Sequence, residues 1–374
     1  MSAFKKFVLA GSAVALFATA PAFAQIAPTI PAEAAGRLAE AKSIVHTIGR
    51  GQVLAIEAVR PAPGKPTLLM MPGVNRALRL DDVSLTSLVA EGFGVVAYNM
   101  SAQPLSIALL PDGERSNLVS TPSLESLARE AEIAGKRVGQ ELGLTNLVPV
   151  SLSYTGAVSP FLKGQPLVIE TVPMTSSDEA NPKLGAYRRQ LRAGEIWNPI
   201  FGPGITRSLL DQAYNMAWEK QVTDITRQYS LPSSRHREMV EGYTTLSRAV
   251  EGFDWTQVKR LPQETRRIFI LAGDEGPSLF RDQVETFKRV RKETKGALLI
   301  LIGESGHIIP ADQPVAYAKI LSRIFAGEFN DSEVVLYTPS KDETLKATGP
   351  GADKVIEALL GRGGGGGSGS GGTR

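Results

Sequence analysis

The sequence contains no cysteine, only three histidines and almost no excess of either charge. Without cysteine there can be no disulfide, no zinc–thiolate site and no thiol nucleophile. His46, His236 and His307 are far apart in the chain, so we expect neither a multi-histidine metal site nor any other cofactor. Once Lys5 and Lys6 are set aside, 39 basic residues face 38 acidic ones. That balance provides no strong field for nucleic acid or an anionic membrane surface, and neither is expected as a partner.

The only long apolar run lies at the start of the chain. Lys5 and Lys6 precede the apolar stretch Phe7–Ala20, and Pro21-Ala22-Phe23-Ala24 follows it. This order of charge, apolar run and small residues is typical of a secretory signal peptide. The run is short for a membrane span and rich in Ala, Gly and Ser. We expect residues 1–24 to be removed near Ala24, with the chain exported to the periplasm or secreted and not stably inserted in a membrane.

Short apolar runs alternate with helical patterns between residues 52 and 327. Several runs are apolar at successive positions, as expected of strands buried on both faces of a parallel sheet. The strand-like runs are Val53–Ile56, Thr67–Met71, Gly94–Tyr98, Leu147–Val150, Leu167–Val172, Ile268–Ala272 and Ala297–Ile302. This alternation predicts an α/β fold, a doubly wound and mostly parallel sheet with helices on both faces.

One long segment interrupts the alternation. Residues 177–261 show helical patterns and no convincing strand, which predicts a helical cap inserted between the sixth and seventh strands. Such an insert lies over the carboxyl edge of the sheet, either as a lid on a site or as ordinary packing. The expected organisation is then a core of residues 25–176 and 262–328, a helical lid at 177–261, a C-terminal extension at 329–360 and a disordered Gly/Ser-rich tail at 361–374.

A serine follows the run Leu147–Val150 on what should be a tight turn. The segment Ser151-Leu152-Ser153-Tyr154-Thr155-Gly156 resembles the G-x-S-x-G nucleophile turn, with Ser153 at its apex. Such a turn exposes the serine at the sheet edge and directs the next residue's N–H toward an incoming carbonyl oxygen. Ser151 and Thr155 replace the usual flanking glycines, and Thr155 is the larger departure.

A histidine and a glycine stand at the ends of two other strand-like runs. His307 lies on the loop Gly303–Pro314 after the last run, and the order serine first, histidine last suits a catalytic triad on this type of sheet. Gly73 follows the run Thr67–Met71 and would let the backbone approach a substrate. A backbone N–H in the turn at Gly73 and the backbone N–H of Tyr154 would give the two oxyanion donors that acyl transfer requires.

These blocks together resemble the α/β-hydrolase superfamily over about residues 52–327. The resemblance rests on Thr67–Arg76, Gly94–Ser106, Leu144–Ala157, Ile268–Pro277 and Gly303–Pro314, in that order. It implies a nucleophile at Ser153, a base at His307 and oxyanion donors at the backbone of Val74 and Tyr154. Pro72 stands where the superfamily often has a histidine before the oxyanion glycine.

The acid of the implied triad is the position that departs most from the superfamily pattern. The superfamily commonly places an aspartate where this chain has Gly276, and the carboxylates available are Asp274 and Glu275 just before it. We favour Asp274, with Glu275 as the alternative. Because some members use an acid after the sixth strand, Glu170 and Asp178 remain open as well.

The expected function follows from the resemblance. It is an exported serine hydrolase that cleaves a carboxylic ester or related acyl bond through an acyl-enzyme, acting on a small-molecule acyl substrate. Apolar side chains of the lid would contact that substrate, namely Trp197, Phe201, Leu210 and Tyr214, together with Leu209 and Trp218. Peptidase, thioesterase, lactonase and acyltransferase activities share this fold. The alternative from another class is a catalytically inactive hydrolase fold that serves as a binding or scaffold protein.

Overall fold

The structure is a computed structural model that describes residues 32–74, 77–118, 122–173, 215–250, 253, 264–275, 277–294 and 296–362. The expected signal peptide, residues 363–374 of the expected tail, and Asp178 lie outside the described residues. The same holds for five of the apolar lid residues, Trp197, Phe201, Leu209, Leu210 and Tyr214.

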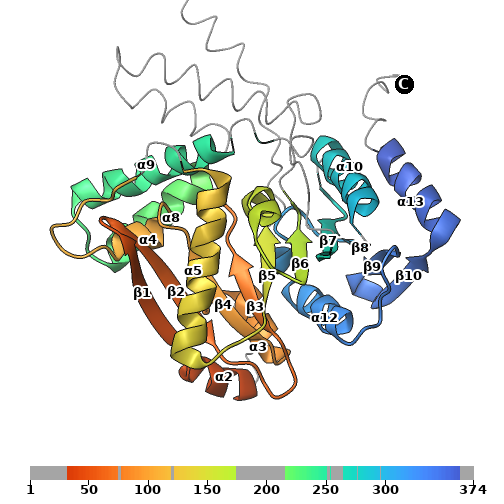
Figure 1. The fold of residues 1–374 in the computed structure, drawn as a ribbon, viewed down its shortest axis with the longest axis horizontal. Helices are drawn as coiled ribbons and strands as arrows, with labels where there is room; N and C mark the ends of the chain where they lie inside the picture. Colours follow the sequence, from red (N-terminus) through yellow and green to blue (C-terminus); the bar gives the residue numbers. More distant parts are fainter. Residues whose placement is uncertain are drawn as a thin grey trace, which may run out of the picture.

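A single twisted sheet of ten strands forms the centre of the described part of the chain (Figure 1). The strand order is β1-β2-β4-β3-β5-β6-β7-β8-β9-β10. Neighbouring strands from β4 through β9 run parallel, whereas β1, β2 and β10 pair antiparallel with their neighbours at the two edges. The predicted doubly wound, mostly parallel sheet is confirmed.

The strands are β1 (Lys42–Gly49), β2 (Gln52–Val59), β3 (Thr67–Met71), β4 (Gly94–Asn99), β5 (Leu147–Leu152), β6 (Leu167–Thr171), β7 (Arg266–Ala272), β8 (Ala297–Ile302), β9 (Val334–Thr338) and β10 (Glu343–Ala347). The helices are α2 (Ala32–Ala39), α3 (Val83–Ala90), α4 (Pro104–Ala108), α5 (Leu124–Leu142), α8 (Asn215–Gln228), α9 (Ser233–Ala249), α10 (Pro277–Glu293), α11 (Ile309–Asp312), α12 (Pro314–Phe325) and α13 (Gly349–Arg362). Short 3-10 turns lie at η1 (Ser153–Ala157), η2 (Ser159–Phe161) and η4 (Pro339–Lys341).

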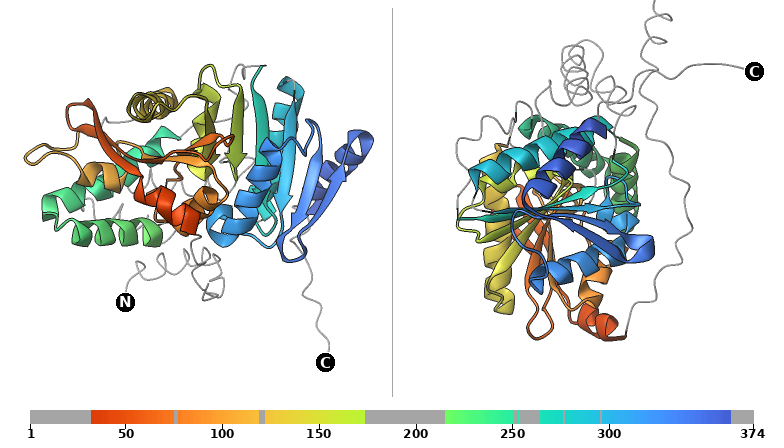
Figure 2. Two further views of the ribbon diagram at one scale, coloured as in Figure 1. Left: turned by 90° about the horizontal axis from the view of Figure 1, so that it is seen from below. Right: turned by 90° about the vertical axis from the view of Figure 1, so that its right-hand side faces the viewer.

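Two apolar cores lie on the two faces of the sheet, because successive residues of a strand point to opposite sides. In β7, Phe269 and Leu271 belong to the core under α5, α10 and α13, whereas Ile268 and Ile270 belong to the core under α2, α3 and α12. The edge-on view in Figure 2 shows helices on both sides of the fanned sheet. Burial on both faces accounts for the near-continuous apolar runs in the sequence.

Two strands without a predicted counterpart, β1 and β10, form the edges of the sheet. Strand β1 has half its residues exposed and lacks a buried run, and β10 is mostly exposed. The start of α5 is set by its N-cap residue, Ser123. The helix begins at Leu124, because the Ser123 hydroxyl accepts a hydrogen bond from the N–H of Ser126 (3.1 Å).

Two helices of the interrupting segment are described, and both lie between β6 and β7 in the chain. They are α8 and α9, and their helical conformation agrees with the helical patterns expected in this segment. The two helices pack on each other and on α4 (Figure 1). Within the described ranges, none of the helices combines the length and apolarity that crossing a bilayer would need.

Candidate active site

Ser153 lies at the junction of β5 and the 3-10 turn η1, in a strained backbone conformation. Its φ of 51° falls in the left-handed region that residues other than glycine rarely adopt. A strand that turns this abruptly into a helix directs the serine out of the sheet edge. The side chain is only partly buried, so its hydroxyl is within reach of solvent and substrate.

The two residues that replace the flanking glycines each make specific hydrogen bonds. The Thr155 hydroxyl accepts from the N–H of Leu152 (2.9 Å) and lies 3.1 Å from the carbonyl oxygen of Met71, to which it donates. It thereby joins the end of β3 to the turn. The buried Ser151 hydroxyl donates to the Glu170 carboxylate (2.5 Å). Both departures from the glycine pattern are therefore accommodated by hydrogen bonds that the sequence pattern does not reveal.

His307 lies within hydrogen-bond distance of the serine, although 154 residues separate them. Its Nε2 atom is 2.8 Å from the Ser153 hydroxyl oxygen, and the imidazole is 31% exposed. The other histidines are placed elsewhere. His46 lies on the edge strand β1, and His236 of α9 contacts the Thr226 hydroxyl at 3.2 Å. The expected pairing of Ser153 with His307 is thus present in the structure.

The carboxylate that contacts His307 is Glu275, which differs from the preference for Asp274. The Glu275 Oε2 atom lies 2.5 Å from His307 Nδ1, and the Glu275 side chain is 5% exposed. Asp274 is exposed, and its N–H donates to the Ser305 carbonyl oxygen (3.0 Å). This backbone bond fixes the loop, and adjacent side chains on an extended loop point to different sides. Only the second carboxylate therefore faces the imidazole.

Glu170, the other described candidate for the acid, is engaged in a buried ion pair. Its carboxylate lies 2.7 Å from the Arg267 guanidinium and accepts hydrogen bonds from the Ser151 and Ser159 hydroxyls (2.5 Å each). Both charged side chains are almost completely buried, and burial lowers the pKa of Arg267, an effect that the Glu170 charge opposes. Through these contacts Glu170 links β6 to β5 and β7.

The segment after β3 passes next to the serine. A Cβ atom placed on Gly73 would lie 3.9 Å from Cβ of Ser153, so the backbone here is in contact distance of the turn. The fully buried Gln103 donates to the Gly73 carbonyl oxygen (3.0 Å) and accepts from the Met100 N–H (2.9 Å). Val74 is half-buried and Tyr154 is buried. The two proposed oxyanion donors therefore belong to segments that meet at Ser153.

The C-terminal extension contacts the histidine loop. The N–H of Gly303 donates to the Tyr337 carbonyl oxygen at the end of β9 (2.9 Å). The Ser340 N–H and hydroxyl both donate to the Glu304 carboxylate, at 2.9 and 2.5 Å. The sequence offered no signal for this role, because a local pattern does not indicate which distant loop a strand will adjoin.

One lid residue assigned to substrate contact has a different place in the structure. Trp218 is 1% exposed, its indole N–H donates to the Met239 carbonyl oxygen (3.1 Å), and its ring lies 5.1 Å from that of Tyr243. It joins α8 to α9 and is not available to a ligand. The assignment of Trp218 to a substrate-facing surface was wrong, because the apolar pattern of a helix does not distinguish helix packing from ligand contact.

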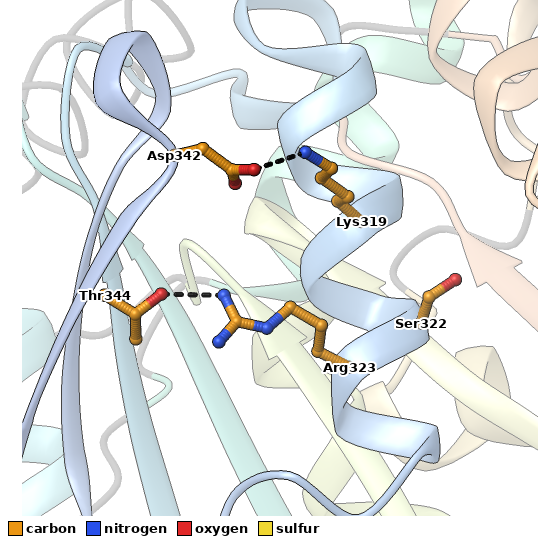
Figure 3. Close-up of a pocket in the computed structure, with 5 residues that line it drawn as sticks. All are labelled: Lys319, Ser322, Arg323, Asp342 and Thr344. Atoms are coloured by element: carbon orange, nitrogen blue, oxygen red, sulfur yellow. Dashed lines mark hydrogen bonds and ion pairs between the residues drawn. The ribbon is translucent and has the colours of Figure 1, made fainter.

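A hollow of about 440 Å³ lies between α12 and β10, lined by Lys319, Ser322, Arg323, Asp342 and Thr344 (Figure 3). None of these residues belongs to the Ser153 site. Both cationic side chains of the hollow have partners. Lys319 pairs with Asp342 (2.7 Å), and Arg323 contacts Thr344 (2.7 Å) and Glu328 (2.8 Å).

Across the described residues, no group of three His, Asp or Glu side chains could hold a metal ion.

Comparison with known structures identifies the fold. An alpha/beta hydrolase enzyme from a Medee basin deep-sea metagenome library matches with a TM-score of 0.50 and 14% identity, over 77% of this chain and 98% of that one. A thermophilic esterase from Thermogutta terrifontis matches with a TM-score of 0.47 and 16% identity, over 76% of this chain and 98% of that one. Carboxylesterase CesB from Bacillus subtilis matches with a TM-score of 0.43 and 14% identity, over 79% of this chain and 96% of that one.

Neither the protein-family models nor the curated protein sequences gave a match to the chain. The likeness therefore lies in the arrangement of strands and helices, and the chain has the α/β-hydrolase fold.

Proposed function

Because the chain has the α/β-hydrolase fold with Ser153, His307 and Glu275 in hydrogen-bonded series, we propose that it is a serine hydrolase that cleaves carboxylic esters. The observation that carries the proposal is the contact of both imidazole nitrogens, one with the serine hydroxyl and the other with a buried carboxylate. This is the arrangement by which a histidine withdraws a proton from a serine and is stabilised as imidazolium.

In the proposed reaction, the Ser153 oxygen attacks the ester carbonyl carbon while His307 Nε2 takes the hydroxyl proton. The carbonyl π electrons move to the oxygen, which the N–H groups of Val74 and Tyr154 stabilise. Collapse of this intermediate breaks the bond to the alcohol, which leaves with the proton from His307. A water molecule, deprotonated by His307, then attacks the acyl carbon of the acyl-enzyme. The bond between the acyl carbon and the Ser153 oxygen breaks, His307 returns the proton to that oxygen, and the carboxylic acid is released. Glu275 holds the imidazole in the required tautomer throughout.

The acyl substrate is proposed to be small and apolar. Ile308, directly after His307, is 49% exposed and offers an apolar surface beside the base. Trp197, Phe201, Leu210 and Tyr214 are retained as proposed substrate contacts of the insert. Export is also part of the proposal, on the signal-like order of residues 1–24.

The test uses the chain without residues 1–24, 4-nitrophenyl acetate and butyrate as substrates, and a fluorophosphonate probe that labels activated serines. We expect hydrolysis and labelling by the native chain, and loss of both in Ser153→Ala. Only the weak catalysis of the remaining groups should persist.

Ser151→Ala is the matched control, because it removes a hydroxyl two residues away that faces Glu170. It should retain labelling and turnover when assayed below its own melting temperature. Absence of labelling and of turnover in the native chain would instead favour an inactive hydrolase fold that serves as a binding or scaffold protein.

A further inference from the structure

Hydrogen bonds hold the residue just before Val74 and the residue three positions after it. On one side the Gly73 carbonyl oxygen accepts from the Gln103 amide (3.0 Å), which belongs to the loop after β4. On the other side the Ala77 N–H donates to the side-chain oxygen of Gln221 (2.9 Å). Gln221 lies on α8, so one of the two contacts comes from the inserted helices and not from the sheet core.

The second donor segment is also attached to the inserted helices. The Tyr154 hydroxyl donates to the Leu246 carbonyl oxygen of α9 (2.7 Å), and the Tyr154 side chain is 1% exposed. Leu246 is one of the last four residues of α9, whose carbonyl groups have no partner within the helix. The phenol therefore satisfies a helix-terminal carbonyl and joins the nucleophile turn to α9 with one bond.

The backbone of α9 is in direct contact with the loop that bears Gln103. A Cβ atom on Gly242 would lie only 2.1 Å from the Ala102 carbonyl oxygen, so glycine is required for this approach. Ala102 precedes Gln103, whose amide holds Gly73. The position of α9 is thus fixed against the same loop that holds the oxyanion segment.

We propose that α8 and α9 align the two oxyanion-donating N–H groups through Gln221 and Tyr154, which makes these two side chains positioning residues for ester cleavage. This inference rests on the proposed serine hydrolase function. Oxyanion donors act only within about 2.7–3.1 Å of the developing charge, and small displacements of a reacting geometry lower rates steeply. Loss of either bond should therefore weaken transition-state stabilisation more than substrate binding.

The test compares Tyr154→Phe and Gln221→Leu with the native chain on 4-nitrophenyl butyrate. Each should lower kcat by about five- to tenfold, the rate equivalent of one hydrogen bond, while KM changes less than twofold. Gln221→Glu keeps a side-chain oxygen that can accept from Ala77 and should restore most of the rate.

Thr226→Val is the matched control. It removes a hydrogen bond between α8 and α9, between the Thr226 hydroxyl and His236 Nδ1, that does not involve either oxyanion segment. It should leave kcat within twofold of the native value. A general loosening of the inserted helices would instead lower kcat in the control as strongly as in the test variants, and that result would overturn the proposal.

A second readout isolates the oxyanion. A trifluoromethyl ketone reacts with the serine to form a tetrahedral adduct, and this adduct carries a negatively charged oxygen. The inhibition constant of the ketone should therefore rise in Tyr154→Phe and Gln221→Leu in proportion to the loss of kcat/KM. Unchanged inhibition and unchanged kcat in both variants, with an active native chain, would overturn only this inference. An inactive native chain that the fluorophosphonate does not label would overturn the proposed function, and the positioning role would fall with it.

Discussion

At the scale of single residues, the site depends on which of two adjacent carboxylates faces the imidazole. Glu275 reaches His307 from the loop after β7, and the backbone bond from Asp274 to Ser305 leaves the Asp274 side chain in solvent.

We expect Glu275→Gln to lower kcat by about a thousandfold or more, because a neutral amide neither fixes the required tautomer nor stabilises the imidazolium. Steady-state kinetics with 4-nitrophenyl butyrate and melting curves of the same samples provide the measurement. A small effect on the rate would remove Glu275 from the triad.

Asp274→Asn is the control, with a rate within a few-fold of the native chain. If Asp274→Asn were the inactive variant and Glu275→Gln the active one, the roles assigned to the two carboxylates would be exchanged.

At the scale of elements, glycine determines how closely α9 approaches the sheet edge. Gly242 lies within α9, and its contact with the Ala102 carbonyl leaves no room for a Cβ atom. Glycine in a helix interior costs about 1 kcal/mol relative to alanine. The chain therefore carries a locally unfavourable residue at the point where tertiary packing requires it.

Gly242→Ala should shift α9 away from the loop and lower both the melting temperature and kcat, because the bond from Tyr154 to Leu246 depends on where α9 lies. Thermal unfolding and ester hydrolysis measure the two effects.

Gly36→Ala in α2 is the matched control, since nothing lies within 4 Å of a Cβ atom at that helical position. It should raise the free energy of unfolding by about 0.5–1 kcal/mol. A stabilised Gly242→Ala variant with normal kcat would contradict the close packing.

At the scale of the whole molecule, the C-terminal extension continues the sheet and contacts the loop that bears His307. Strand β9 pairs with β8 in parallel, and β10 closes that edge with an antiparallel pairing. Helix α13 packs on α10 through Ala352, Ile356 and Leu359, and the pairs Arg291–Asp353 (2.8 Å) and Lys288–Glu357 (2.7 Å) flank this contact. The surface ion pairs add little, so the apolar contact carries most of the stabilisation.

A chain that ends at Thr348 lacks α13 and should lose at least about 3 kcal/mol of unfolding free energy, because burying an aliphatic side chain contributes about 1.5–3 kcal/mol. Urea unfolding followed by circular dichroism measures the loss. A chain that ends at Arg362 keeps α13 and should unfold at the same urea concentration as the full chain. Equal midpoints for all three chains would show that α13 does not contribute to the stability of the core.

The sequence alone determined the fold class. Strands buried on both faces require continuous apolar runs, and the helices that connect them require apolar residues at the spacing of a helical turn. The sequence also predicted Ser153 and His307 as candidate site residues, since each follows such a run at the edge where parallel strands end. Asp274 and Glu275 are equivalent at that level, and only the backbone bond to Ser305 separates them.

The roles of Thr155, Gln103, Gln221 and Gly242 were likewise set by tertiary structure. Each depends on a backbone group that is remote in the chain, and local pattern carries no information about such a partner. The spacing of apolar residues indicates which face of a helix or strand is buried. A hydrogen bond between distant segments, in contrast, forms only once the folded sheet has brought those segments together.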